Sequence, residues 1–201
     1  AQVGDDFHIN PEEIEAKYFG VLTKIFNVAR FASQFEVPSD LSSEPNNLEI
    51  EDKWILSEFS QMMHKVEESW TKIDIYNAAQ SIKNFSTGVF PSHWLEMAKS
   101  RLYDGDEAAA WTLHRIVRDV LTSLSPICPF FTHYLSTTLY GRSSVDVREF
   151  PDIIDVRSEL LDLTNPVIEF NSEVWRLKKD GGLSLNTEIS DVKIPEDLSI
   201  L

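Results

Sequence analysis

The sequence predicts a mainly α-helical protein, an antiparallel bundle of five helices followed by a small C-terminal α/β extension. Apolar residues recur at three- and four-residue steps through most of the chain, which is typical of amphipathic helices. Proline, glycine and acidic turn residues separate these segments, and short connections favour antiparallel neighbours. The expected organisation is an N-terminal linker over residues 1–10, the bundle over residues 11–142, and the extension, expected to be truncated, over residues 143–201.

The first expected helix covers residues 11–35. Asn10 can cap it, Pro11 suits the first turn, and the two glutamates that follow favour the positive end of the helix dipole. A loop rich in proline, serine and asparagine is expected over residues 36–49, because these residues break helices and form turns.

The second and third helices follow the same periodicity. The second covers residues 51–70, and the third begins within residues 73–77. Pro91 has no backbone N–H to donate, so we expect it to kink or interrupt the third helix. The helical pattern resumes over residues 94–102 and ends at a turn over residues 103–106.

The fourth expected helix has the clearest pattern, with one apolar face from residue 113 to residue 124. The fifth covers residues 129–140 and ends at a glycine. Residues 143–150 alternate weakly and suggest a short strand or an extended arm. Residues 153–180 read as helical, with Pro166 starting, bending or breaking that stretch, and residues 183–194 suggest strands.

Composition excludes several classes of protein. The 201 residues include 33 acidic and 18 basic side chains, a net charge of −15, which argues against a generally basic nucleic-acid-binding surface. Residues 51–144 are nearly balanced, with 11 acidic and 9 basic side chains, so a polyanion could approach a local patch there. Cys128 is the only cysteine, which excludes a disulfide scaffold and a cysteine-based zinc site. No apolar run is long enough to span a membrane, and we expect a cytoplasmic protein without a membrane partner.

The sequence contains no recognisable catalytic or metal site. The 7 glycines do not form a phosphate-binding loop, and neither a nucleophile elbow nor a zinc-protease motif is present. The five histidines are scattered, and no Glu-x-x-His pairs suggest a metal centre within a bundle. We therefore expect no catalytic residue, no metal and no cofactor in this segment.

Basic and aromatic residues are expected to gather at one end of the bundle. Because successive helices run in opposite directions, the end of the first helix, the start of the second and the end of the third should meet. The candidate RNA-binding residues at these positions are Arg30, Phe31, Lys53, Trp54, Lys99, Arg101 and Tyr103. Cations can pair with phosphates while unstacked bases of a single-stranded loop stack on rings. The alternative is that the rings cap the core and the cations only solvate it.

Seven segments, in this order, are similar to a known family. They are residues 3–8 (VGDDFH), 24–31 (KIFNVARF), 52–57 (DKWILS), 76–80 (YNAAQ), 94–103 (WLEMAKSRLY), 124–132 (LSPICPFFT) and 178–186 (KKDGGLSLN). They resemble the anticodon-binding helical domain of class I aminoacyl-tRNA synthetases of the valine, isoleucine and leucine group. Residues 94–103 and 178–186 resemble the valine type most. The chain departs from the family pattern at residues 89–93 (VFPSH), which interrupt the third helix, and it lacks the catalytic HIGH and KMSKS signatures.

The resemblance implies that residues 1–10 are a linker from a missing N-terminal catalytic domain. It also implies that this segment recognises the anticodon stem-loop of valine tRNA and is inactive without that domain. The parent enzyme would be a valine–tRNA ligase that uses ATP and Mg²⁺. The far end of the first helix would then be the anticodon end, where the candidate residues gather. Two alternatives stay open: the same domain of an isoleucyl- or leucyl-tRNA synthetase, and a helical protein-interaction module without an RNA role, which the net charge favours.

Overall fold

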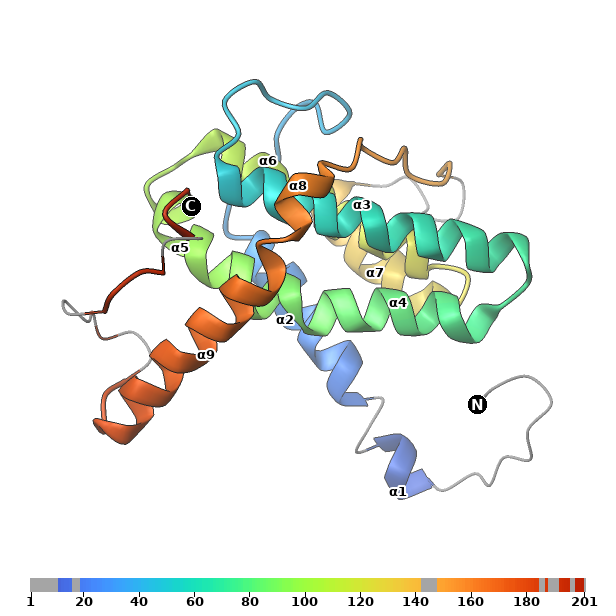
Figure 1. Ribbon diagram of the computed structural model, residues 1–201. Coiled ribbons are helices and arrows are strands. Elements are labelled where there is room, and N and C mark those ends of the chain that lie inside the picture. Colours follow the sequence, from blue (N-terminus) through green and yellow to red (C-terminus); the bar gives the residue numbers. More distant parts are fainter. Residues whose placement is uncertain are drawn as a thin grey trace.

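The computed structural model describes residues 11–15, 19–141, 148–184, 187, 192–195 and 198–200. Most of the described helices pack around one core, and the first helix in the chain lies apart from them (Figure 1). The helices are, in chain order, α1 (Pro11–Ile14), α2 (Gly20–Ala32), α3 (Ile50–Thr71), α4 (Ile75–Thr87), the π-helical segment η2 (Phe90–Trp94), α5 (Leu95–Tyr103), α6 (Glu107–Leu124), α7 (Pro129–Tyr140), α8 (Ser158–Leu161) and α9 (Thr164–Asp180). The prediction of a mainly α-helical bundle is confirmed.

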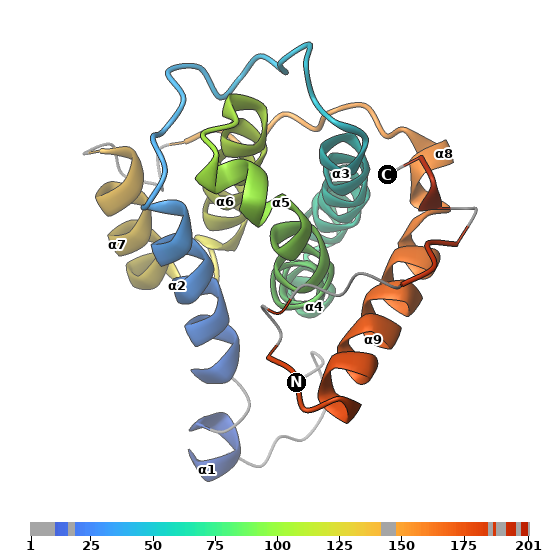
Figure 2. The same ribbon diagram turned by 90° about the vertical axis from the view of Figure 1, so that its left-hand side faces the viewer.

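Helix α6 lies at the centre of the bundle. Fifteen of its 18 residues are buried, and it contacts α2, α3, α4, α5 and α7. Figure 2 shows α6 and α5 between α2 and α7 on one side and α3 on the other. A helix surrounded in this way needs apolar side chains on more than one face, which explains why its periodicity is the clearest in the sequence.

Helices α3 and α4 form an antiparallel pair and share the most extensive helix–helix contact of the described residues. Ile73, in the connection, has a positive φ of 58°. The Asp74 side chain caps α4 by accepting a hydrogen bond from the backbone N–H of Asn77 at 3.1 Å. The cap satisfies an N–H that has no partner within the helix.

The third predicted helix is interrupted where Pro91 was expected to act. Helix α4 ends at Thr87, and the wider turn of η2 carries the chain past the proline into α5. Gly88 is required there, since a Cβ atom at this position would lie 2.6 Å from the carbonyl oxygen of Asn84. The stacked rings of Phe85, Phe90 and Trp94, with centroids 5.6 and 5.5 Å apart, bury the interruption in the core.

The first predicted helix is shorter than expected. Helix α2 ends at Ala32, where the backbone N–H groups of the next three residues bond back to carbonyls of the last turn. Residues 1–10 and 16–18, which the linker and the first helix were expected to include, lie outside the described residues. The loop predicted over residues 36–49 is confirmed, and its last residue, Glu49, caps α3.

The segment after α7 differs in part from its prediction. Gly141, with a φ of 91°, ends α7 as expected. The strand considered for residues 143–150 falls mostly outside the described residues, because residues 142–147 are not described. The helix predicted over residues 153–180 forms as the short α8 and the longer α9. Pro166 lies in the first turn of α9, where its missing N–H costs nothing.

Strands of a C-terminal α/β extension were predicted over residues 183–194, of which residues 185, 186 and 188–191 lie outside the described residues. No strand is found among the described residues beyond Gly182. The backbone bonds there are those of turns, from Thr187 N–H to the carbonyl of Ser184 and from Leu198 N–H to that of Pro195. A strand needs a neighbouring strand to accept its hydrogen bonds, and alternating apolar residues do not supply one. Instead, Leu198 is buried in the same hydrophobic cluster as the bundle.

Candidate nucleic-acid interface

Three aromatic side chains meet where α2 and α5 end, and we call Phe31, Phe35 and Tyr103 the aromatic tip. The Phe31 and Phe35 centroids are 5.0 Å apart, and the Tyr103 ring lies 6.1 Å from the first and 5.6 Å from the second. The two phenylalanines are half-buried, whereas Tyr103 is 65% exposed. Tyr103 therefore exposes its ring to solvent while that ring packs against the two phenylalanine rings.

The turn predicted over residues 103–106 positions Tyr103. Gly105 adopts a positive φ of 82°, which lets the chain reverse directly after α5. Asp106 then caps α6 by accepting hydrogen bonds from the N–H groups of Ala108 and Ala109 at 2.8 and 3.1 Å. The end of α5 and the start of α6 are thus held together next to the aromatic tip.

Arg101 lies beneath this turn and binds three carboxylates, and we call it and its partners the Arg101 clamp. Its guanidinium donates to Glu51 at 2.8 Å, to Asp52 at 2.7 Å and to Asp106 at 2.8 Å. Burial alone would lower the pKa of Arg101, but the hydrogen bonds to Asp52 and Asp106 outweigh it and raise that pKa above its usual range. The clamp joins the start of α3, the end of α5 and the start of α6.

The buried carboxylate of the clamp has further donors. Asp52 is fully buried and accepts hydrogen bonds from the indole Nε1 of Trp94 at 3.1 Å and from the backbone N–H of Glu49 at 3.2 Å. The second of these bonds belongs to a capping box at the start of α3. Each Asp52 oxygen therefore has a donor, which a buried charge requires.

The structure brings most of the predicted site residues to one end of the bundle. Arg30 is exposed in the last turn of α2, and the half-buried Lys53 lies in the first turn of α3 beside the clamp. Lys99 lies one turn before Tyr103 and pairs with Glu96 at 2.6 Å.

Trp54 differs from the other candidates. It is fully buried, and its Nε1 donates to the hydroxyl of Thr164 at 3.0 Å. Its ring therefore packs in the core and ties α3 to the start of α9.

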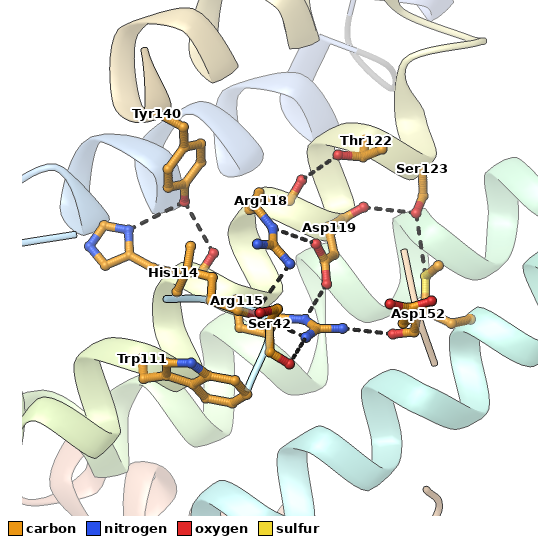
Figure 3. A network of polar contacts seen from close by, with 12 residues as sticks. Ser42, Trp111, His114, Arg115, Arg118, Asp119, Thr122, Ser123, Tyr140 and Asp152 are labelled. Atoms are coloured by element: carbon orange, nitrogen blue, oxygen red, sulfur yellow. Dashed lines mark hydrogen bonds and ion pairs between the residues drawn. The ribbon is translucent and has the colours of Figure 1, made fainter. Parts of the chain in front are cut away.

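The loop between α2 and α3 is anchored to α6 by a polar network that the sequence reasoning missed (Figure 3). The guanidinium of Arg115 donates to Asp119 at 2.5 Å, to the carbonyl of Leu41 at 3.0 Å and to the carbonyl of Asp152 at 2.6 Å. The Trp111 indole donates to the carbonyl of Asp40 at 3.0 Å. Two of these acceptors are backbone carbonyls of the loop, which no side-chain motif could indicate.

His114 connects this network to the aromatic tip. It is fully buried, and its Nε2 lies 3.2 Å from the carbonyl of Phe35. Its Nδ1 lies 3.3 Å from the hydroxyl of Tyr140 (Figure 3). Burial lowers the pKa of His114, and the hydrogen bond to Phe35 offsets part of that effect. The buried ring thus fixes the backbone at the end of α2, next to the Phe35 side chain.

The described residues contain no candidate metal centre. Within them, no group of three or more His, Cys, Asp or Glu side chains could hold a metal ion. Burial raises the pKa of the Cys128 thiol, which disfavours the reactive thiolate. None of the described helices is both long and apolar enough to cross a membrane.

The family model and the individual relatives that match this chain point to the same family. Residues 52–194 match the family model described as the anticodon-binding domain of tRNA ligase. The valine–tRNA ligase of Saccharolobus solfataricus is 32% identical over 193 residues, covering 94% of this chain and 23% of the relative. That of Nanoarchaeum equitans is 30% identical over 198 residues, covering 98% and 25%. That of Aeropyrum pernix is 30% identical over 205 residues, covering 96% and 24%. The chain thus spans about a quarter of the length of these relatives.

Proposed function

Since the chain belongs to the anticodon-binding domain family of tRNA ligases, we propose that it binds the anticodon stem-loop of valine tRNA as a segment of a valine–tRNA ligase. The observation that carries the proposal is the aromatic tip, where an exposed tyrosine lies on two phenylalanines at the end of α2. Bases of a single-stranded loop stack on such rings, and each stacked base contributes about 1–3 kcal/mol.

The charge of the chain makes a local interaction necessary. With a net charge of −15, long-range electrostatics repel a polyanion, so affinity must come from stacking and from a few nearby cations. Exposed Arg30 and the half-buried Lys53 and Lys99 are the cations near the tip that we assign to RNA phosphates. We assign base stacking to Phe31 and Tyr103.

Two of the predicted site residues have supporting roles in this proposal. The guanidinium of Arg101 is occupied by three carboxylates, so it holds helix ends in place and does not pair with a phosphate. Trp54 packs in the core and keeps α9 next to α3.

The reaction belongs to the parent enzyme. We propose that ATP and Mg²⁺ act in a catalytic domain elsewhere in that protein, in the cytoplasm, and that this segment alone does not aminoacylate tRNA. The relatives named above are valine–tRNA ligases, which supports valine over isoleucine or leucine. The family match supports an RNA role over a protein-interaction module.

Filter binding with purified tRNA tests the proposal. The protein should bind valine tRNA more tightly than isoleucine or leucine tRNA. The Tyr103→Ala variant should lose about 1–3 kcal/mol of binding free energy. Tyr134, which is 60% exposed on α7, provides the matched control, and Tyr134→Ala should bind as the wild type does. Equal affinities of the two variants, or no binding to any tRNA at low salt, would contradict the proposal.

A further inference from the structure

A groove of about 520 Å³ extends from the aromatic tip along the bundle. Its walls come from α2, from η2 and α5, and from α9, and Figure 2 shows α2 and α9 on opposite sides of α5. The lining residues that could contact a ligand are Lys24, Asn27, Phe31, Glu96, Lys99 and Trp175. Helix α9 lies beyond the predicted bundle, so this groove could not be anticipated from the order of the bundle helices.

The groove has an excess of positive charge in a strongly acidic chain. Lys24 and Lys99 line it, and Glu96, which pairs with Lys99 at 2.6 Å, is the one acidic residue among its described lining residues. The ammonium group of Lys24 is exposed and makes a hydrogen bond of 3.3 Å to the carbonyl of Thr87. A phosphodiester could replace that long bond to a neutral carbonyl with a shorter bond to an anionic oxygen.

The groove also has a rigid aromatic wall. The Trp175 ring stacks on His93 with centroids 5.4 Å apart and an interplanar angle of 21°. Nδ1 of His93, on η2, lies 3.1 Å from the side-chain amide of Asn171 on α9, so a second contact holds α9 and its Trp175 against His93. A ring that is already held in place loses little conformational entropy when a base stacks on it.

The groove is continuous with the aromatic tip. Phe31 belongs to both, and Lys99 lies on α5 one helical turn before Tyr103. An RNA strand that stacks on Tyr103 can therefore continue past Phe31 into the groove without leaving the surface.

We infer that the groove binds a nucleotide of single-stranded RNA adjacent to the bases at the tip, with its base against Trp175 and its phosphates near Lys24 and Lys99. The Asn27 amide, which has both donors and an acceptor, faces the same groove and could hydrogen-bond the edge of the base. The inference rests on the proposed function, because it takes the ligand to be the loop of the same RNA hairpin.

The test measures binding of the valine tRNA anticodon hairpin over about 50–200 mM salt. The Trp175→Leu variant should weaken binding roughly 5- to 150-fold, and Trp175→Phe should recover part of the loss because it keeps a ring. Lys24→Gln should reduce the slope of log affinity against log salt by about one charge. Lys72→Gln, at the far end of α3, is the matched control and should leave the slope unchanged.

The outcomes separate the inference from the proposed function. If Tyr103→Ala weakens binding while Trp175→Leu and Lys24→Gln do not, the groove inference is wrong and the proposed function stands. If the wild-type protein binds no hairpin, both are wrong. If the Trp175→Leu variant does not fold, its binding measurement is replaced by photo-crosslinking of a thiouridine-substituted hairpin to the wild-type protein. Crosslinks to α9 support the inference, and crosslinks confined to Tyr103 and its neighbours contradict it.

Discussion

Replacing Arg101 by alanine should destabilise the fold far more than removing an exposed cation. The substitution leaves the carboxylates of Glu51, Asp52 and Asp106 without their shared partner. Asp52 is the critical group because it is fully buried and cannot recover hydration when the guanidinium is lost. The expected consequence is separation of the start of α3 from the end of α5.

The magnitude follows from the burial of the pair. Breaking a buried ion pair by removing one partner costs about 3–5 kcal/mol. The lower end, about 3 kcal/mol, applies because Asp52 keeps its bonds from Trp94 and Glu49, and because the Arg101 side chain is 21% exposed. For a chain of this size, each 1 kcal/mol lowers Tm by about 2–4 °C, so Arg101→Ala should lower it by about 6–12 °C.

Thermal unfolding followed by circular dichroism measures this effect. Arg101→Lys should recover only part of the loss, since a single ammonium group lacks the planar fork that reaches three carboxylates. Arg30→Ala, which removes an exposed cation at the same end, should shift Tm by no more than about 2 °C. A Tm for Arg101→Ala equal to that of Arg30→Ala would refute the clamp.

Three further predictions concern stability. Gly88→Ala should lower the free energy of unfolding, measured in urea, by about 1–3 kcal/mol, because the new Cβ atom would lie 2.6 Å from the carbonyl oxygen of Asn84. An unchanged urea midpoint would show that the backbone at residue 88 relaxes freely. Asp106→Ala should lower the free energy of unfolding, measured in the same way, by at least the ~1 kcal/mol that a helix cap contributes. A smaller loss would contradict the inference that Asp106 both caps α6 and belongs to the Arg101 clamp. Burial holds the pKa of His114 below its unfolded value, so the unfolded chain takes up the proton first and the free energy of unfolding should fall as pH drops below about 6.5. His114→Gln should show a shallower fall between about pH 7 and pH 5, and identical pH profiles would contradict a buried neutral imidazole.

The bundle could be predicted because its signals are local. The apolar stripe of residues 113–124 is strong enough to define α6, and the missing N–H of Pro91 accounts for the interruption before α5. The strands predicted beyond Gly182 are not found among the described residues there, and alternation in one segment says nothing about whether a partner strand exists.

The site was only partly predictable, since its decisive contacts are long-range. The order of the helices predicts that Phe31 and Tyr103 meet, and their rings do. It does not predict that Arg101 is bound by Glu51, which is 50 residues away in the sequence. Trp175 was missed because it lies on α9, which is not one of the five helices of the predicted bundle.

The central claim is that RNA binds at the aromatic tip, and tyrosine-selective NMR labelling tests it most directly. Of the 5 tyrosines, Tyr103 lies at the tip, while Tyr76 and Tyr134 are exposed on α4 and α7. On titration with the valine tRNA anticodon hairpin, the ring signals of Tyr103 should shift and those of Tyr76 and Tyr134 should not. Shifts at Tyr134 with an unchanged Tyr103 would place the RNA elsewhere and contradict the account.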